Sequence, residues 1–382
     1  MSEFTCPYEK KCGGCSYIHT PYNEQLEKKK AYVAGLLKSY VKVSKITGME
    51  NPFFYRNKVS AAFGRDKHNN PISGIYEEKS HRIVAIEKCL LEDERADAII
   101  ATIRNLLKSF KIKVYDEDTG YGLLRHVLIR TGKKSGEIMV VLVTASSVFP
   151  SKQNFCNALR KAHPEITTIV QNVNNRTDSM VLSDRENVFY GKGFIEDVLC
   201  GKTFKISAKS FYQINPVQTE LLYQKAIEYA GLTGRETVFD AYCGIGTIGI
   251  IAADKAKKVI GVELNKDAVK DAVVNARKNK INNISFYTAD AGRFMERMAE
   301  DGETADVVFM DPPRNGSSEQ FIKSVLKMEP AKVVYVSCGP ESLARDLKLF
   351  VSGGYKVKAA ECFDMFPHTE HVETVVLMSR VK

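Results

Sequence analysis

The sequence predicts an α/β protein: a Rossmann-like domain at the C-terminal end, preceded by an α+β domain with a cysteine-ligated metal cluster. From residue 237 onward, short β-branched segments alternate with helical segments, which is typical of a parallel sheet. Between residues 40 and 210, strand patterns follow one another with few helices between them, which favours an antiparallel sheet. The third observation is a group of cysteines close to the N-terminus.

The length and these patterns indicate how the chain is divided. With 382 residues, the chain is long enough for two or three domains. We expect residues 1–90 to form the cysteine segment and the start of the central domain. Residues 40–210 form the central α+β domain and residues 211–382 the Rossmann-like domain.

Composition and charge exclude several classes of protein. Hydrophobic residues make up 44% and charged residues 26%, and no apolar run approaches the roughly 20 residues of a membrane helix. The N-terminus has no signal-peptide pattern, so we expect a cytoplasmic protein with no membrane partner. A net charge of +9 favours polyanionic partners. The nine cysteines therefore predict reduced thiols used in metal binding or catalysis rather than a disulfide scaffold.

Four of these cysteines have the spacing of metal ligands. Cys6, Cys12 and Cys15 form a C-x5-C-x2-C pattern, and Cys89 follows at a distance. Four thiolates with this spacing suit an iron–sulfur cluster or a structural zinc, and the spacing alone does not separate the two. Free cysteines or a redox pair are the alternatives. We expect a structural site that attaches the N-terminal loop to the segment near Cys89.

The central region reads as alternating strands and a few helices. Apolar positions at helical spacing with lysines between them predict a basic amphipathic helix over residues 22–40, whose polar face suits either solvent or RNA. We expect strands within residues 55–90, 167–173 and 204–207, a hairpin of residues 125–130 and 137–144, and helices over 91–110 and 151–162. A further helix should run from Pro216 to about residue 229.

Six basic residues lie among the predicted strands of the central region. Exposed, they would suit contacts with phosphate groups, and otherwise they are ordinary polar faces of half-buried strands. The sequence does not decide between these interpretations for Arg56, Lys58, Arg65, Arg125, His126 and Arg130.

The glycine-rich loop of the C-terminal domain predicts a site for a nucleoside-containing ligand. Gly244, Gly246 and Gly249 match G-x-G-x-x-G, and Glu263 ends the next strand, about 20 residues further on. The glycines permit close approach of the backbone, and the acid can accept hydrogen bonds from both ribose hydroxyls. This pattern fits NAD as well as S-adenosylmethionine. Asp240, directly before the loop, favours the cationic S-adenosylmethionine over a pyrophosphate.

The next strands of this domain end in residues that can carry chemistry. The third strand ends near Asp290, and the fourth ends in Asp311-Pro312-Pro313-Arg314, whose prolines fix a rigid turn. The fifth ends at Cys338, where the crevice of an α/β sheet binds ligands. A cysteine there can be a nucleophile, or it is a small buried hydrophobe. We expect the last two strands, around residues 356–362 and 372–378, to form an antiparallel edge.

Taken together, these motifs resemble the RNA (uracil-C5)-methyltransferase family, in particular its members that bear an iron–sulfur cluster and act on 23S ribosomal RNA. The motifs span nearly the whole chain in order and form a specific set, although single members are weak. They are the four cysteines between residues 6 and 89, Phe211-Tyr212-Gln213-Ile214-Asn215, Phe239-Asp240-Ala241-Tyr242-Cys243-Gly244, Asp311-Pro312-Pro313-Arg314, Ser337-Cys338-Gly339-Pro340 and Phe366-Pro367-His368-Thr369-Glu370-His371-Val372-Glu373.

The resemblance implies roles for individual residues. Cys338 would be the nucleophile and Glu373 the general base. Contacts to S-adenosylmethionine would come from Gln213, Tyr242, Glu263 and Asp311, to which the strand-end and glycine-loop pattern adds Asp240, Gly244 and Asp290. The resemblance also implies a [4Fe–4S] cluster, in preference to zinc, on Cys6, Cys12, Cys15 and Cys89.

The resemblance further implies an RNA partner, with 23S ribosomal RNA expected, and a monomeric protein. Many cluster-bearing members carry a small β-barrel RNA-binding domain before the first cysteine, where this sequence has five residues. We therefore expect affinity for RNA to come from the remaining domains.

The implied chemistry agrees with the residue types. Uracil C5 is a poor nucleophile, and addition of a thiolate to C6 would make it nucleophilic by covalent catalysis. A base must then remove the C5 proton, a role that suits Glu373. The target base should be flipped out of its stack to enter the crevice.

Three other functions fit parts of the sequence. An amino-group methyltransferase would use Asp-Pro-Pro followed by an aromatic residue, whereas Arg314 follows here, and a nitrogen target needs no thiol. A non-catalytic RNA-binding module is disfavoured by the presence of both Cys338 and Glu373. A nicotinamide dehydrogenase remains compatible with the glycine pattern alone.

Overall fold

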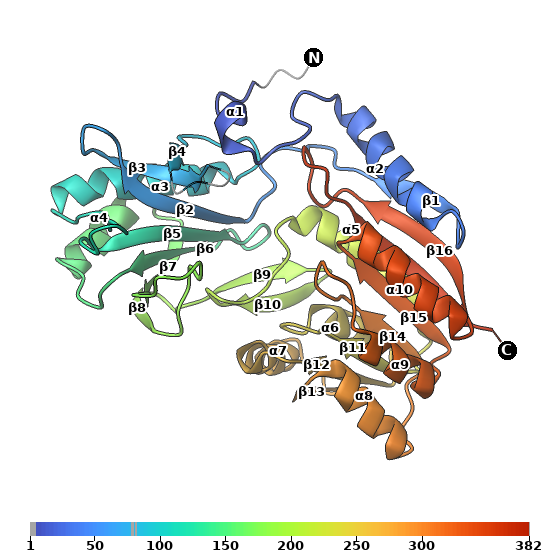
Figure 1. Cartoon of the computed structure of the whole chain (residues 1–382). Helices are drawn as coiled ribbons and strands as arrows, with labels where there is room; N and C mark the ends of the chain where they lie inside the picture. Colours follow the sequence, from blue (N-terminus) through green and yellow to red (C-terminus); the bar gives the residue numbers. More distant parts are fainter. Residues whose placement is uncertain (1–4, 78–79, 81, 382) are drawn as a thin grey trace. The chain divides into compact units, whose positions relative to one another are not determined.

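The computed structural model describes residues 5–77, 80 and 82–381 and divides into two compact units (Figure 1). The first unit contains the residues up to His19, Pro52–Val198 and Lys205–Lys209, and the second contains Thr20–Asn51, Leu199–Phe204 and the chain from Ser210 onward. Strands β9 (Ile195–Leu199) and β10 (Lys202–Ile206) form a two-stranded sheet where the chain passes from one unit to the other. In the described part of the chain, no helix has the length and apolar character needed to span a bilayer.

The first unit is built on a seven-stranded sheet with the order β4-β3-β2-β5-β6-β7-β8. Its elements are α1 (Glu9–Cys12), β2 (Lys58–Arg65), β3 (Pro71–Tyr76), β4 (Ile83–Ala85), α3 (Glu94–Ser109), β5 (Leu124–Thr131), β6 (Ile138–Thr144), α4 (Lys152–Ala162), β7 (Ile166–Val173) and β8 (Glu186–Tyr190). Residues 78, 79 and 81 of the predicted strand region lie outside the described residues.

The sheet of the first unit is mixed rather than purely antiparallel. Strand β6 pairs antiparallel with β5 but parallel with β7. The reason is the helix α4 between β6 and β7, because a crossover through a helix returns the chain in the same direction. All seven residues of β6 are buried, as expected for a continuous apolar run at the centre of a sheet.

Three of the six basic residues noted in the sequence are buried within the first unit. Arg125 donates to the carbonyls of Asn174 and Arg176, and Arg130 donates to the carbonyl of Ala208. His126 is also buried. These three side chains therefore belong to the interior of the sheet and its loops. Arg56 and Lys58 are half-buried, and Arg65 is exposed.

The second unit contains an eight-stranded sheet with the order β1-β16-β17-β15-β14-β11-β12-β13. Its helices are α2 (Tyr22–Leu37), α5 (Pro216–Ala230), α6 (Thr247–Ala253), α7 (Lys266–Lys278), α8 (Ala291–Glu300), α9 (Glu319–Met328) and α10 (Pro340–Ser352). Its strands are β1 (Val43–Thr47), β11 (Thr237–Ala241), β12 (Lys258–Glu263), β13 (Ile284–Thr288), β14 (Val307–Met310), β15 (Lys332–Ser337), β16 (Tyr355–Phe363) and β17 (Glu373–Arg380).

The strand order of the second unit creates a crevice at the carboxyl ends of its parallel strands. Strand β11 pairs with β12 on one side and with β14 on the other, all in parallel. The strands that directly follow β11 in the sequence, β12 and β13, extend the sheet on one side of it, and the later strands β14 and β15 extend it on the other side. Ligands of open α/β sheets bind outside the strand ends at such a reversal point.

The final strands differ from the predicted antiparallel edge. Strands β16 and β17 are antiparallel as expected, but β17 lies between β15 and β16, and β1 pairs in parallel with β16 beyond them. The edge of the sheet on this side is therefore β1. This strand is short and half-exposed and contains a lysine, which is typical of an edge strand and leaves no apolar signal in the sequence.

Candidate active site

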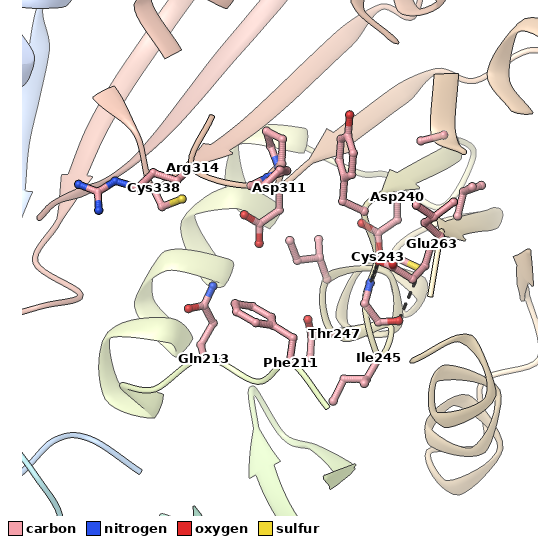
Figure 2. Close-up of a pocket in the computed structure, with 18 of the residues that line it drawn as sticks. Phe211, Gln213, Asp240, Cys243, Ile245, Thr247, Glu263, Asp311, Arg314 and Cys338 are labelled. Carbon is pink, nitrogen blue, oxygen red and sulfur yellow. Dashed lines mark hydrogen bonds between the residues drawn. The ribbon is translucent and has the colours of Figure 1, made fainter. Parts of the chain in front are cut away.

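A cavity of about 660 Å³ lies at the carboxyl ends of the parallel strands in the second unit (Figure 2). It is lined from the segment before α5, the ends of β11, β12, β14 and β15, the loop before α8, and the start of β17. The cavity brings together all nine of the cofactor and catalytic residues predicted within this domain: Gln213, Asp240, Tyr242, Gly244, Glu263, Asp290, Asp311, Cys338 and Glu373.

The loop after β11 forms one side of the cavity. Asp240 is buried at the end of β11, and its carboxylate accepts a hydrogen bond of 2.8 Å from the backbone N–H of Gly249. A Cβ atom at Gly249 would lie 2.7 Å from Asp240 Oδ2, so the close approach of α6 to this carboxylate requires glycine. Burial raises the pKa of Asp240 to about 8, and the nearby carboxylates of Asp311 and Glu263 add to the increase.

Glu263 is held in place by the backbone around it. Its Oε2 accepts from the N–H of Gly244 at 3.1 Å, and its Oε1 accepts from the N–H of Asn265 at 2.8 Å. Tyr242 has a positive φ of 61°, which turns the loop into the cavity, and its hydroxyl lies 2.9 Å from Ser317 Oγ. This geometry presents a carboxylate and a tight loop to a ligand, as required for binding a ribose.

The opposite side of the cavity carries the candidate reactive groups. Figure 2 shows Cys338 and Asp311 together with Arg314, while Asp240 and Glu263 lie on the other side. Glu373 is 2% exposed, and its Oε2 is buried without a hydrogen-bond partner among the described residues. A buried carboxyl oxygen with no partner costs free energy and therefore needs an explanation, and here Glu373 lines the cavity.

The pKa values on this side are raised, chiefly by burial. Burial raises the pKa of Glu373 to about 8, with a further contribution from the charge of Asp311. Burial likewise raises the pKa of Asp311 to about 7. The pKa of the Cys338 thiol rises to about 12 because of burial first and then of Glu373 and Asp311. Strongly shifted groups gathered in one cavity are typical of active sites.

Several lining residues are not predicted as site residues by the sequence. Phe211 and Phe366 contribute aromatic rings, and Tyr223 and Thr247 contribute hydroxyls that lie 3.5 Å apart. Both phenylalanines belong to motifs that the sequence singles out, but nothing in an isolated sequence distinguishes an aromatic residue that lines a cavity from one that packs in a core.

The four predicted metal ligands line one small pocket in the first unit. Cys6, Cys12, Cys15 and Cys89 share it with apolar side chains that include Ile18, Ile86 and Leu91. Burial raises the pKa of Cys89 to about 12, and that of Cys15 to about 12 with contributions from Cys12 and Cys6. Within residues 5–77, 80 and 82–381, no three histidine, cysteine, aspartate or glutamate side chains are arranged to hold a metal ion. Four soft thiols around one pocket are a ligand set that both an iron–sulfur cluster and a zinc ion use, and the geometry does not show either.

Comparison with known proteins shows the family of the chain. Residues 21–381 match the family model described as tRNA (Uracil-5-)-methyltransferase, so the chain belongs to this family. It is 42% identical over 381 residues to an uncharacterized RNA methyltransferase of Halalkalibacterium halodurans, covering 98% of this chain and 83% of that protein. It is 43% identical over 387 residues to an uncharacterized RNA methyltransferase of Clostridium acetobutylicum, covering 100% of this chain and 84% of the relative.

A solved structure supports the same assignment. The Pyrococcus abyssi tRNA (uracil-54, C5)-methyltransferase, in complex with S-adenosyl-L-homocysteine, aligns with a TM-score of 0.80 and 29% identity. The alignment covers 96% of this chain and 85% of that one. The prediction of an S-adenosylmethionine-dependent enzyme of the RNA (uracil-5-)-methyltransferase family is therefore confirmed. The dehydrogenase alternative is excluded.

Proposed function

We propose that this enzyme methylates C5 of a uridine in RNA through a covalent adduct between Cys338 and C6 of the base. The observation that carries the proposal is the buried, unpartnered carboxyl oxygen of Glu373 in the same cavity as the Cys338 thiol. A thiol and a base serve the two halves of this reaction, whereas methylation of an amino group requires no thiol.

The steps follow from the residue chemistry. S-adenosylmethionine supplies the methyl group when bound. The Cys338 thiolate adds to C6 of the uracil, so that an S–C6 bond forms and negative charge develops on C5 and O4. C5 then takes the methyl group as the S–methyl bond of the donor breaks and S-adenosylhomocysteine leaves. Glu373 removes the C5 proton, the electrons of the C5–H bond restore the C5–C6 double bond, and the S–C6 bond breaks to release the Cys338 thiolate.

For the methyl donor we propose contacts from both sides of the cavity. Glu263, with Gly244 beside it, would bind the ribose hydroxyls, and Asp240 would ionise when the cationic half of the donor binds near it, because a nearby positive charge lowers the pKa that burial has raised. The other proposed contacts are Gln213, Tyr242, Asp290 and Asp311, which line the same cavity.

We also propose a [4Fe–4S] cluster on Cys6, Cys12, Cys15 and Cys89, with zinc as the alternative. The support is the shared pocket of the four thiols and its apolar lining. Metal analysis and visible absorption of anaerobically purified protein test this point: about four iron and four sulfide per chain support the cluster, whereas stoichiometric zinc without iron contradicts it.

The proposed substrate is 23S ribosomal RNA, because the cysteine pattern resembles that of cluster-bearing members that act there. Transfer RNA is the second candidate, since the Pyrococcus abyssi protein is named for uridine 54 of tRNA. Incubating the enzyme with each purified, unmodified RNA and measuring 5-methyluridine by mass spectrometry after digestion distinguishes the two.

The mechanism is tested by trapping the adduct. The protein is incubated with S-adenosylmethionine and RNA containing 5-fluorouridine, which has no C5 proton to lose, and the products are separated on a denaturing gel. We expect a shifted protein–RNA band that is absent with Cys338→Ala. If the wild-type protein binds the donor but forms no adduct with either class of RNA, the C5 mechanism is wrong.

A further inference from the structure

Within the second unit, helix α2 holds the loop that leads to Glu373. This loop, residues 364–372, connects β16 to β17, and Glu373 is the first residue of β17. Phe366 within the loop lines the cavity. The helix lies far from this loop in the sequence, yet several of its polar side chains are bound to the loop.

The first contact is a buried ion pair. Lys29 Nζ lies 2.5 Å from Asp364 Oδ1 and donates a second hydrogen bond, of 3.1 Å, to the carbonyl of Phe366. The two charged side chains, of Lys29 and Asp364, are 1% and 0% exposed. Tyr22, the first residue of the same helix, donates its hydroxyl to Asp364 Oδ2 at 2.8 Å. A lysine is almost never fully buried unless it is paired, and both hydrogen-bond acceptors of Lys29 named here belong to the loop. The side chain of Lys29 therefore fixes the loop to the helix.

The second contact is a pair of hydrogen bonds between Gln25 and His368. The backbone N–H of His368 donates to Gln25 Oε1 at 2.9 Å, and Gln25 Nε2 lies 3.1 Å from His368 Nδ1. His368 has a φ of 66°, a backbone conformation that residues other than glycine rarely adopt. A residue in this region persists where its surroundings hold it, and Gln25 binds it through both backbone and side chain.

A third contact holds the loop from another element. Asn215, which caps α5 by accepting from the N–H of Gln218, also donates from Nδ2 to the carbonyl of Met365 at 3.0 Å. Two successive loop carbonyls, those of Met365 and Phe366, therefore accept hydrogen bonds from two different helical segments. The backbone leading from β16 to Glu373 is thus fixed on both sides.

The charged and polar residues that hold this loop indicate a role in positioning it, in addition to packing. A buried ion pair adds little net stability compared with apolar side chains of similar volume, but it defines geometry. A carboxylate that must reach a single proton requires placement within hydrogen-bond reach. On these grounds we propose that Lys29 and Gln25 are positioning residues that hold the 364–372 loop so that Glu373 can remove the C5 proton. This inference rests on the function proposed above.

The proposal is tested by separating formation of the adduct from its breakdown. With ordinary uridine RNA, the wild-type adduct forms and resolves, so little accumulates. In Lys29→Met, Cys338 should still add and the methyl group should still transfer, but the misplaced Glu373 should remove the C5 proton slowly. We expect a methylated protein–RNA band that accumulates on a denaturing gel and decays at least tenfold more slowly than that of the wild type.

Two further variants keep the test decisive. Gln25→Leu removes the contacts with His368 without leaving a buried charge, and it should show the same accumulation even if Lys29→Met folds poorly. Lys29→Met combined with Asp364→Asn removes both charges of the pair, so it isolates the effect of the missing hydrogen bonds and should still accumulate the adduct. Lys38→Met, at the exposed C-cap position of the same helix, is the matched control and should resolve the adduct at the wild-type rate.

The failure of this inference is distinguishable from failure of the proposed function. If wild-type protein forms no adduct with 5-fluorouridine RNA, the proposed function fails. If the wild type forms that adduct but folded Gln25→Leu and Lys29→Met resolve the uridine adduct at the wild-type rate, the positioning role is wrong. Equal losses in adduct formation and breakdown would also overturn it, because they would indicate a general loss of structure.

Discussion

At the scale of single residues, burial determines how the candidate active site ionises. Glu373 and Cys338 share one cavity, and burial raises the pKa of the carboxyl to about 8 and that of the thiol to about 12. At neutral pH both groups are therefore mostly protonated before substrate binds. Both must lose a proton to act, but they act at different steps, so their effects on rate can be separated.

The pH dependence of adduct breakdown should follow Glu373. Below its pKa the ionised fraction of a base falls about tenfold per pH unit, so breakdown should accelerate with rising pH and level off above about pH 8. Adduct formation should continue to accelerate above pH 8, because the Cys338 thiol ionises only at higher pH. Rapid-quench measurements between about pH 6 and 9.5 follow both steps. A breakdown rate that is flat over this range would contradict the role of Glu373.

At the scale of elements, one glycine controls how closely helix α6 approaches β11. A Cβ atom at Gly249 would lie 2.7 Å from Asp240 Oδ2 and 3.1 Å from Ile284 Cδ1. In Gly249→Ala we expect a loss of about 1–3 kcal/mol in the free energy of unfolding, the usual cost of overpacking. The same substitution should weaken binding of S-adenosylhomocysteine, because the added methyl group would displace Asp240, which lines the cavity. Chemical denaturation and calorimetric titration measure the two effects.

The same substitution in helix α2 is the matched control. A Cβ atom at Gly35 would meet nothing within 4 Å, and the residue lies inside a regular helix. Gly35→Ala should therefore stabilise the protein by about 0.5–1 kcal/mol, the difference in helix propensity. A stabilising effect of Gly249→Ala would show that α6 can shift without cost and that glycine is not required there.

The elements also show which parts of the fold the sequence can predict. Strands with apolar runs or β-branched residues, such as β6 and β15, are predictable because their own composition indicates them. Strand β1 and the position of β17 between β15 and β16 are not, because pairing depends on contacts between distant segments. Helix α2 is predictable as a helix, but its buried face contains Gln25 and Lys29, and Tyr32, which the apolar pattern includes, is exposed. Nothing in the sequence distinguishes the buried Lys29 from the more exposed lysines of the same helix.

At the scale of the whole molecule, the sequence predicts the second unit's site better than the surroundings of that site. Motifs at the ends of parallel strands must meet at one edge of a sheet, so the strand pattern alone assigns Asp240, Glu263, Asp311 and Cys338 to one crevice. Residues that reach the cavity through irregular loops, such as Phe366, cannot be placed in this way. Their position depends on side-chain contacts that have no periodic pattern.

The division into two units separates the two candidate sites. All four cysteines of the thiol pocket belong to the first unit, and every residue lining the large cavity belongs to the second. If each unit folds around its own core, damage to the thiol pocket should leave the cavity intact. Cys89 is a suitable position for this test, because its backbone N–H also donates to the Asp97 carboxylate at 2.8 Å and so remains anchored.

We therefore expect Cys89→Ser to lower the content of the proposed iron–sulfur cluster and the thermal stability of the first unit. The affinity for S-adenosylhomocysteine should change by less than about twofold, since the substitution affects only one of the two units. Calorimetric titration, metal analysis and thermal unfolding of the anaerobically purified variant measure these quantities. Cys156→Ser, at a buried thiol outside the pocket, controls for the loss of any buried cysteine. A tenfold loss of S-adenosylhomocysteine affinity in Cys89→Ser alone would show that the thiol pocket and the methyl-donor cavity are energetically coupled.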